Sequence, residues 1–247
     1  MAPLDPKDVV KYVENNIDTF HSKRLKKLQT LELNEVLGRK NPYLFKAKNI
    51  HEANELVKTI MDAYISSREE TLFGEFLEGL AIFVAEKVHG GQKSASPGID
   101  LDFEKDGIRY LVSIKSGPNW GNSSQIKQMI ANFKTAKKIL GTNTSIKNVV
   151  CINGCCYGHI KKIDQADYLK YCGQDFWEFI SGNKNLYKEI IEPLGYEAKK
   201  HNDVYHEEYS KLVNVFTSAF IKDFCIDDGK INWDKLVEFN SSSYQRT

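Results

Sequence analysis

Long apolar runs are missing from this sequence of 247 residues, of which 41% are hydrophobic. The longest, residues 79–85 (GLAIFVA) and 148–152 (NVVCI), are far shorter than the roughly 20 residues that a membrane-spanning helix needs. The first ten residues, MAPLDPKDVV, also lack the apolar stretch of a secretory signal. We therefore expect a cytoplasmic protein.

Cysteine and proline are scarce as well. The chain has five cysteines, and four of them are crowded into residues 151–172, which does not match the disulfide framework of a secreted protein. Six prolines are spread over the chain, and no internal repeat, low-complexity tract or long linker interrupts it. We expect reduced thiols and a single domain, residues 1–247, with one sizeable core.

The formal net charge of +1 hides an uneven distribution. Residues 61–108 hold four basic and ten acidic residues, a net charge of −6, whereas residues 109–170 hold ten basic and two acidic residues, a net charge of +8. Adjacent acidic and basic segments suit an enzyme that binds a metal ion through carboxylates and a nucleic acid backbone through lysines. Solvated helix faces are the alternative explanation.

Apolar residues recur at helical spacing near both ends of the chain. Residues 6–20 and 51–66 show this pattern, and residues 67–90 continue it until a glycine pair. Helical patterns return from residue 165 onward. We expect three segments: helical residues 1–70, an α/β core at residues 71–165 and helical residues 166–247.

Three strands are predicted in the core, at residues 98–104, 108–116 and 147–153. A tight turn at residues 105–107 joins the first two as a hairpin, with Gly107 able to take a positive φ. A helix at residues 123–140, capped by Ser123 or Ser124 and closed by Gly141, precedes the third strand. Because such a crossover favours parallel strands, we predict an α/β fold with a mixed central sheet flanked by helices.

Strand alternation places polar side chains together at one end of this hairpin. Asp100 and Asp102 project to the same face of their strand, and Ser113 and Lys115 share a face of the next strand. Carboxylates suit Mg²⁺, which stabilises charge on a scissile phosphate, and a lysine can orient the attacking water. Charged side chains that simply reach solvent at a strand end are the alternative.

The stretch PGIDLDFEKDGIRYLVSIKSGPNWGNSSQ, residues 97–125, resembles the core of the PD-(D/E)XK nucleases. More narrowly, it resembles type II restriction endonucleases whose lysine strand runs into a KSGPN loop. Residues 173–191 and 227–241 are similar to C-terminal helical segments of such enzymes, so the likeness covers about residues 70–240. It implies a central sheet of the restriction-endonuclease kind.

The resemblance also implies a catalytic and metal-binding site. It assigns the aspartate of the family motif to Asp100 and the lysine to Lys115, with the backbone carbonyl of Ile114 as a further metal ligand. Ser113 stands where the family usually has Asp or Glu, so one ligand of the pattern is absent. We expect its replacement from one of three carboxylates, in the order Glu78, Glu75 and Asp102.

Two groups of side chains are candidates for contact with DNA. Asn and Gln amides can hydrogen-bond to adenine edges, serines at a helix start can hold a phosphate, and lysines bind the backbone. The first group is Asn119, Trp120, Asn122, Ser123, Ser124, Gln125, Lys127 and Lys134, and the second is Tyr157, His159, Lys161 and Lys162. A turn with a helix cap is the alternative for the loop residues of the first group, and a solvated helix face is the alternative for Lys137 and Lys138 of the same helix.

The cysteines near the third strand allow two other interpretations. The spacing of Cys151, Cys155, Cys156 and His159 matches none of the usual structural zinc patterns, and Cys151 is better explained as a small buried strand residue. A cysteine nucleophile with His159 as base would define a different enzyme class. No orienting acid or oxyanion-binding loop flanks either residue in the sequence.

With the resemblance, these residues predict a type II restriction endonuclease that uses Mg²⁺ to hydrolyse double-stranded DNA at a specific sequence, leaving a 5′-phosphate. A palindromic target implies a homodimer, and restriction implies a companion DNA methyltransferase as genetic partner. The alternatives are a structure-specific repair or recombination nuclease with the same core and a DNA-binding module without catalysis.

Overall fold

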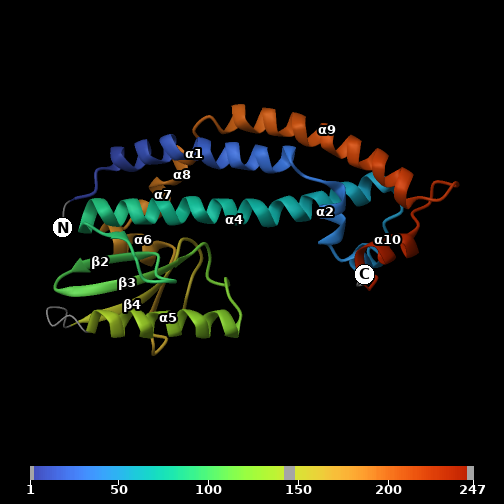
Figure 1. The fold of residues 1–247 in the computed structure, drawn as a ribbon. Coiled ribbons are helices and arrows are strands. Elements are labelled where there is room, and N and C mark those ends of the chain that lie inside the picture. Colours follow the sequence, from blue (N-terminus) through green and yellow to red (C-terminus); the bar gives the residue numbers. More distant parts are fainter. Residues whose placement is uncertain (1–2, 142–147, 244–247) are drawn as a thin grey trace. The chain divides into compact units, whose positions relative to one another are not determined.

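The computed structural model describes residues 3–141 and 148–243 of the chain. The chain divides into two compact units. The first unit combines Met1–Asp18 with Phe73–Tyr196, and the second combines Thr19–Leu72 with Glu197–Thr247. Helices α1 (Pro6–Gln29) and α4 (Ala53–His89) contribute residues to both units (Figure 1).

The first unit holds a five-stranded mixed sheet (Figure 1). Its strands, in spatial order, are β1 (Gln92–Lys93), β2 (Leu101–Lys105), β3 (Ile108–Lys115), β4 (Val149–Cys155) and β5 (Leu169–Cys172). The pairs β1–β2 and β2–β3 are antiparallel, while β3–β4 and β4–β5 are parallel. The predicted α/β fold with a mixed sheet is confirmed.

A tight turn and a crossover helix, both predicted from the sequence, determine how the central strands β2, β3 and β4 pair. Asp106 and Gly107, at φ of 52° and 73°, form the hairpin turn between β2 and β3, where positive φ values match the strand twist. The crossover helix α5 (Ser123–Gly141) returns the chain so that β4 pairs with β3 in parallel. Both features were expected from the sequence.

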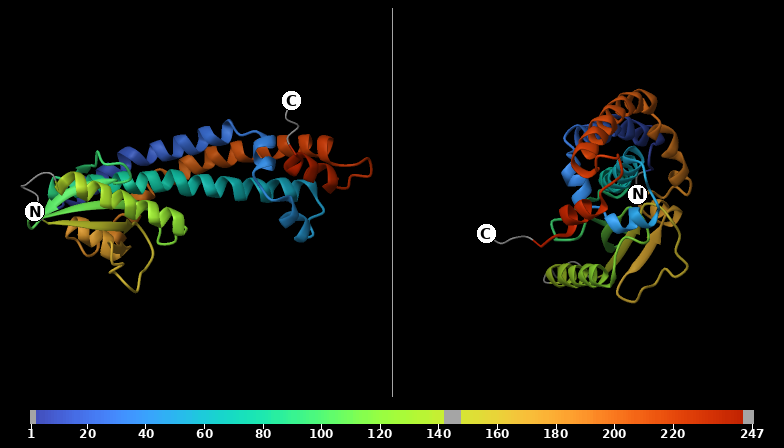
Figure 2. Two further views of the ribbon diagram at one scale, coloured as in Figure 1. Left: turned by 60° about the horizontal axis from the view of Figure 1, so that its bottom comes forward. Right: turned by 90° about the vertical axis from the view of Figure 1, so that its right-hand side faces the viewer.

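Alternate residues of β3 face different helices. Leu111 is fully buried in a cluster with Met129 and Phe133 of α5, which lies along one face of the sheet (Figures 1 and 2). Tyr110 instead packs edge-on against Phe179 of α6 (Gln174–Ser181), with ring centroids 5.0 Å apart. The hairpin is therefore held between two helical layers within the first unit.

The sequence patterns missed β5, because residues from 165 onward were expected to be helical. Leu169–Cys172 is instead a parallel strand beside β4, and α6 begins only at Gln174. The strand is four residues long, too short to show an alternating pattern. After α6 come two short helices, α7 (Leu186–Glu189) and α8 (Ile191–Leu194).

The second unit is built from helices around its own apolar core. Besides parts of α1 and α4, it contains α2 (Leu33–Gly38), α3 (Pro42–Ala47), α9 (Ala198–Phe224) and α10 (Trp233–Ser241). Leu56, Met61 and Phe220 are fully buried in that core. Among the described residues, no helix combines the length and the apolar character needed to span a membrane.

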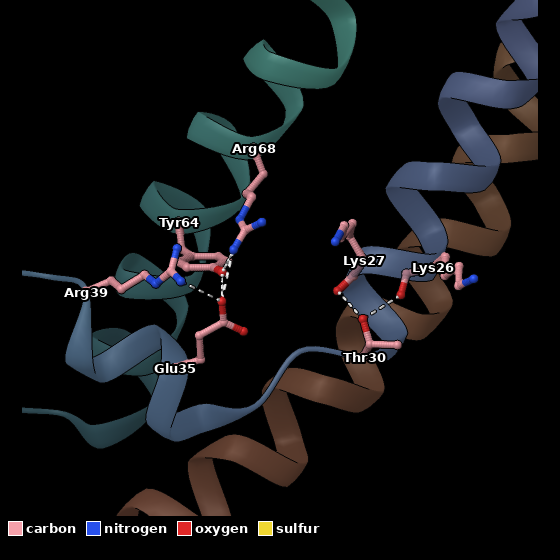
Figure 3. A network of polar contacts seen from close by, with 7 residues as sticks. All are labelled: Lys26, Lys27, Thr30, Glu35, Arg39, Tyr64 and Arg68. Atoms are coloured by element: carbon pink, nitrogen blue, oxygen red, sulfur yellow. Dashed lines mark hydrogen bonds and ion pairs between the residues drawn. The ribbon is translucent and has the colours of Figure 1, made fainter. Parts of the chain in front are cut away.

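A polar network joins α2 to α4 inside the second unit (Figure 3). Glu35 accepts a hydrogen bond from the Tyr64 hydroxyl at 2.5 Å and pairs with Arg68 at 2.9 Å and Arg39 at 3.5 Å. The Tyr64 hydrogen bond and then the arginine charges lower the pKa of Glu35. The short helix α2 is thus bound to α4 by side chains as well as by apolar packing.

Replacing Gly154 by Ala should destabilise the first unit. A Cβ at this position in β4 would lie 2.6 Å from Cδ2 of Phe176, a buried ring in α6, so the core would be overpacked. We expect the free energy of unfolding in urea to fall by about 1–3 kcal/mol. Gly141→Ala is the control, because an added Cβ there meets no atom within 4 Å. Equal stabilities of the two variants would contradict the packing of α6 on β4.

Candidate active site

Asp100 lies just before β2, and its carboxylate is bound by the neighbouring strand. Its Oδ2 accepts a hydrogen bond from the Ile114 backbone N–H at 2.7 Å and a longer one from the Ser113 hydroxyl at 3.4 Å. The ammonium of Lys115 lies 3.8 Å from the same oxygen. The structure therefore brings Asp100, Ser113, Ile114 and Lys115 together, as the sequence predicted for the hairpin.

Ser113 occupies the position where an acid was expected, and it is 1% exposed. A second carboxylate there would bring a negative charge next to Asp100, whereas a hydroxyl can donate a hydrogen bond to it. Ser113 therefore helps to orient Asp100 but supplies no anionic oxygen.

Glu78, on α4, is electrostatically coupled to this group. Burial is the main cause of its raised pKa. The negative charge of Asp100 raises this pKa further, while Lys93 and Lys115 lower it. Its side chain is 31% exposed and lies 3.9 Å from the Lys93 ammonium. A half-buried carboxylate that is within electrostatic reach of Asp100 is suited to receive a cation.

The two other candidate carboxylates are placed differently. Asp102 pairs with Arg109 at 2.6 Å, so its charge is already balanced by a neighbouring strand residue. Glu75 is exposed one helical turn before Glu78, and both line an open hollow of about 550 Å³. Of the three, Glu78 has the clearest link to Asp100, because its pKa responds to the Asp100 charge.

The donor atoms at this end of the sheet fit a hard divalent cation. Asp100 and Glu78 offer carboxylate oxygens, and Ile114 offers a backbone carbonyl. Mg²⁺ binds oxygen ligands and usually needs only one or two protein carboxylates, because water and substrate phosphate fill the remaining positions. The set of residues therefore suits Mg²⁺ despite the serine at position 113.

The loop after Lys115 is tied to the sheet by polar contacts. The Trp120 indole N–H donates to Oδ1 of Asn153 on β4 at 3.1 Å, and the Lys170 ammonium donates to the Pro118 carbonyl at 2.7 Å. A Cβ on Gly117 would overlap the ring of Tyr157. Sequence reasoning missed Asn153 and Lys170, although an asparagine ending the apolar run NVVCIN was a visible anomaly.

Asn122 caps α5, so the expectation of a Ser123 or Ser124 cap is wrong. Its Oδ1 accepts the N–H groups of Ser124 and Gln125 at 3.0 and 3.1 Å, and Oε1 of Gln125 accepts the N–H of Asn122 at 2.9 Å. This reciprocal pair is a capping box. The amide oxygens of Asn122 and Gln125 therefore already take part in the cap, while both residues are exposed.

The other candidate DNA contacts remain on the surface. Asn119, Ser123, Ser124, Lys127 and Lys134 are exposed, and Trp120 is partly buried. Lys134 pairs with Asp167 at 3.1 Å. In the second group, Tyr157, His159, Lys161 and Lys162 are exposed in the segment that follows β4. Their contact with DNA stays a prediction.

The cysteines of β4 are not suited to nucleophilic attack. Cys151, Cys155 and Cys156 are buried and form no disulfide. Burial raises the pKa of all three thiols, that of Cys155 to about 12, so they are protonated at neutral pH. Cys151 is the small buried strand residue that the sequence predicted.

A comparison with protein families decides the class of this protein. The model of the family described as type II restriction endonuclease EcoO109I matches residues 7–202. The chain belongs to this family. Among curated proteins, no sequence matches it. The resemblance to restriction endonucleases is thus confirmed, and this EcoO109I-family protein is a nuclease whose substrate is DNA.

Replacing Glu78 by Gln should stabilise the metal-free EcoO109I-family protein at neutral pH. Because its folded-state pKa is raised, the stability that protonated Glu78 provides is present at low pH and lost as the pH rises through that pKa. The variant should therefore gain stability over the wild type between about pH 4 and neutrality.

Urea unfolding in the presence of a chelator, repeated across this pH range, measures the effect. Glu104→Gln, at an exposed position of β2, controls for the change in net charge. A stability difference between Glu78→Gln and this control that does not change with pH would show that the Glu78 pKa is not raised.

Proposed function

We propose that this protein is a Mg²⁺-dependent type II enzyme that hydrolyses double-stranded DNA at a specific sequence and leaves a 5′-phosphate. One observation carries the proposal: the Lys115 ammonium lies 3.8 Å from the Asp100 carboxylate at the end of the β2–β3 hairpin. Membership of the EcoO109I family supports the same reaction class.

The residues at this site have separate roles in the proposed reaction. Asp100, Glu78 and the Ile114 carbonyl would hold Mg²⁺, which when bound supplies a Lewis acid for the phosphate and lowers the pKa of water. Lys115 would donate a hydrogen bond to the attacking water and orient it toward phosphorus. Ser113 would keep Asp100 in place through its hydroxyl group.

The substrate would be bound by the exposed residues of the two groups described above. The basic surface of α5, with Lys127 and Lys134, would contact phosphates, and the loop at Asn119 would lie close to the Lys115 end of β3. Since palindromic targets match proteins with two-fold symmetry, the active form would be a homodimer. The protein would act in the cytoplasm, where a companion methyltransferase would protect the host DNA from cleavage.

The alternatives differ in what they do to plasmid DNA with Mg²⁺. Discrete fragments would support sequence-specific restriction, and unspecific or junction-selective cutting would support a repair nuclease with the same core. Binding without cutting would support a DNA-binding module, an alternative that stays open because Ser113 replaces a ligand of the family pattern.

Removing the charge of Lys115 should slow cleavage by about 10²–10⁴-fold, the usual contribution of a group that assists proton transfer. Removing the charge of Asp100 should also slow cleavage, because a ligand for Mg²⁺ is lost. Lys115→Gln and Asp100→Asn are compared with Lys105→Gln, which removes a lysine at the opposite end of the hairpin. Single-turnover rates with excess enzyme and Mg²⁺ measure the effect, and DNA affinity in a chelator confirms that the variants still bind. Wild-type rates in either site variant would refute the assignment.

The three candidate carboxylates can be separated by neutral substitutions. Glu78→Gln should slow cleavage and raise the Mg²⁺ concentration needed for half-maximal rate, because a metal ligand is lost. Glu75→Gln should cleave at nearly the wild-type rate. Asp102→Asn should lower stability instead, since it leaves the Arg109 charge without its 2.6 Å partner. If only Glu75→Gln or only Asp102→Asn changed the Mg²⁺ concentration needed for half-maximal rate, that residue would be the metal ligand instead of Glu78.

A further inference from the structure

Asn153 is a fully buried polar side chain in the middle of the sheet. It lies on β4 directly beside Ser113 in the parallel register, and it is 0% exposed. A buried amide without hydrogen bonds would cost about 1–3 kcal/mol, so its partners define what it contributes. Asn153 is not among the residues that would hold Mg²⁺ or orient the attacking water.

Both ends of the Asn153 amide are bound to the segment that carries Lys115. Its Nδ2 donates to the Ser113 carbonyl at 3.1 Å, and its Oδ1 accepts the Trp120 indole N–H at 3.1 Å. The Cys155 thiol is a weaker, longer partner of the same oxygen at 3.9 Å. Because an indole only donates and a carbonyl only accepts, these two partners fix the orientation of the amide.

Trp120 connects this amide to the lysine. The Lys115 ammonium lies 5.4 Å from the centroid of the Trp120 ring, within the range of a cation–π contact, and 3.8 Å from the Asp100 carboxylate. Trp120 also packs against the apolar cluster beneath α5. The flexible lysine side chain therefore has two contacts for its ammonium group, the Asp100 carboxylate and the Trp120 ring, and Asn153 is hydrogen-bonded to that ring.

We infer that Asn153 is a positioning residue: through Trp120 and the Ser113 carbonyl, it sets the place of the Lys115 ammonium for the cleavage step. This inference rests on the proposed function for its effect on rate. A misplacement of about 1 Å can cost about 10²-fold in rate, so loss of Asn153 should slow cleavage by about that factor without weakening DNA binding.

The first test is kinetic. Asn153→Leu keeps the approximate side-chain size and removes both hydrogen bonds, and Trp120→Phe keeps an aromatic ring but removes the indole N–H. We expect kcat to fall by about 10²-fold in Asn153→Leu with KM for DNA unchanged. The double variant should be no slower than the slower single one, because both changes break one connection.

Ser181→Ala is the matched control for general loss of a buried hydrogen bond. Ser181 lies in α6 of the same unit, is 5% exposed and donates to the Trp177 carbonyl at 2.6 Å. Its variant should lose stability but keep the wild-type rate. Equal slowing by Ser181→Ala and Asn153→Leu, or strictly multiplicative effects in the double variant, would overturn the inference.

A crystal structure of Asn153→Leu provides a test that does not depend on cleavage. The Trp120 ring and the Lys115 ammonium should both be displaced relative to Asp100. An unmoved lysine would overturn the inference even if cleavage were slower. If instead the wild type cuts no DNA with Mg²⁺, the proposed function fails, while the crystal structures still decide whether Asn153 places Lys115.

Discussion

The hydrogen bond from the Ile114 backbone to the Asp100 carboxylate is the contact on which the candidate site depends. At 2.7 Å it joins the start of β2 to the end of β3, and the Asp100 N–H donates back to the Val112 carbonyl at 2.9 Å. Because these two bonds fix the carboxylate relative to the strand, the next residue, Lys115, reaches the same oxygen. Strand geometry therefore places the charged pair.

The serine at position 113 changes how the site is charged. With a hydroxyl beside Asp100, the candidate for the second carboxylate is Glu78 of helix α4, whose pKa is raised by burial and by the Asp100 charge. Two carboxylates that repel each other at a half-buried position favour a bound cation, which would relieve the repulsion and lower that pKa. The exchange of Asp or Glu for Ser is thus compatible with metal binding from a different element.

Local patterns in the sequence are sufficient to predict the hairpin, the crossover helix and the proximity of Asp100 to Lys115. They do not predict β5, because a strand of four residues is too short to show an alternating hydrophobic pattern. Only its pairing with β4 defines it as a strand. The cap of α5 was a different error, because Asn122, Ser123 and Ser124 all suit a cap. Asn122 and Gln125 are three residues apart, which is the spacing of a capping box, and this spacing favours Asn122 as the cap.

Trp120 shows why the rest of the site needed three-dimensional information. Its ring packs on the α5 cluster and lies near the Lys115 ammonium, and its N–H donates to Asn153, 33 residues later in the chain. The apolar cluster that holds α5 on the sheet therefore also supports the Trp120 ring near the lysine. A substitution that loosens the core around Phe133 would then act on Lys115 through Trp120 without touching DNA, because packed interiors transmit small displacements.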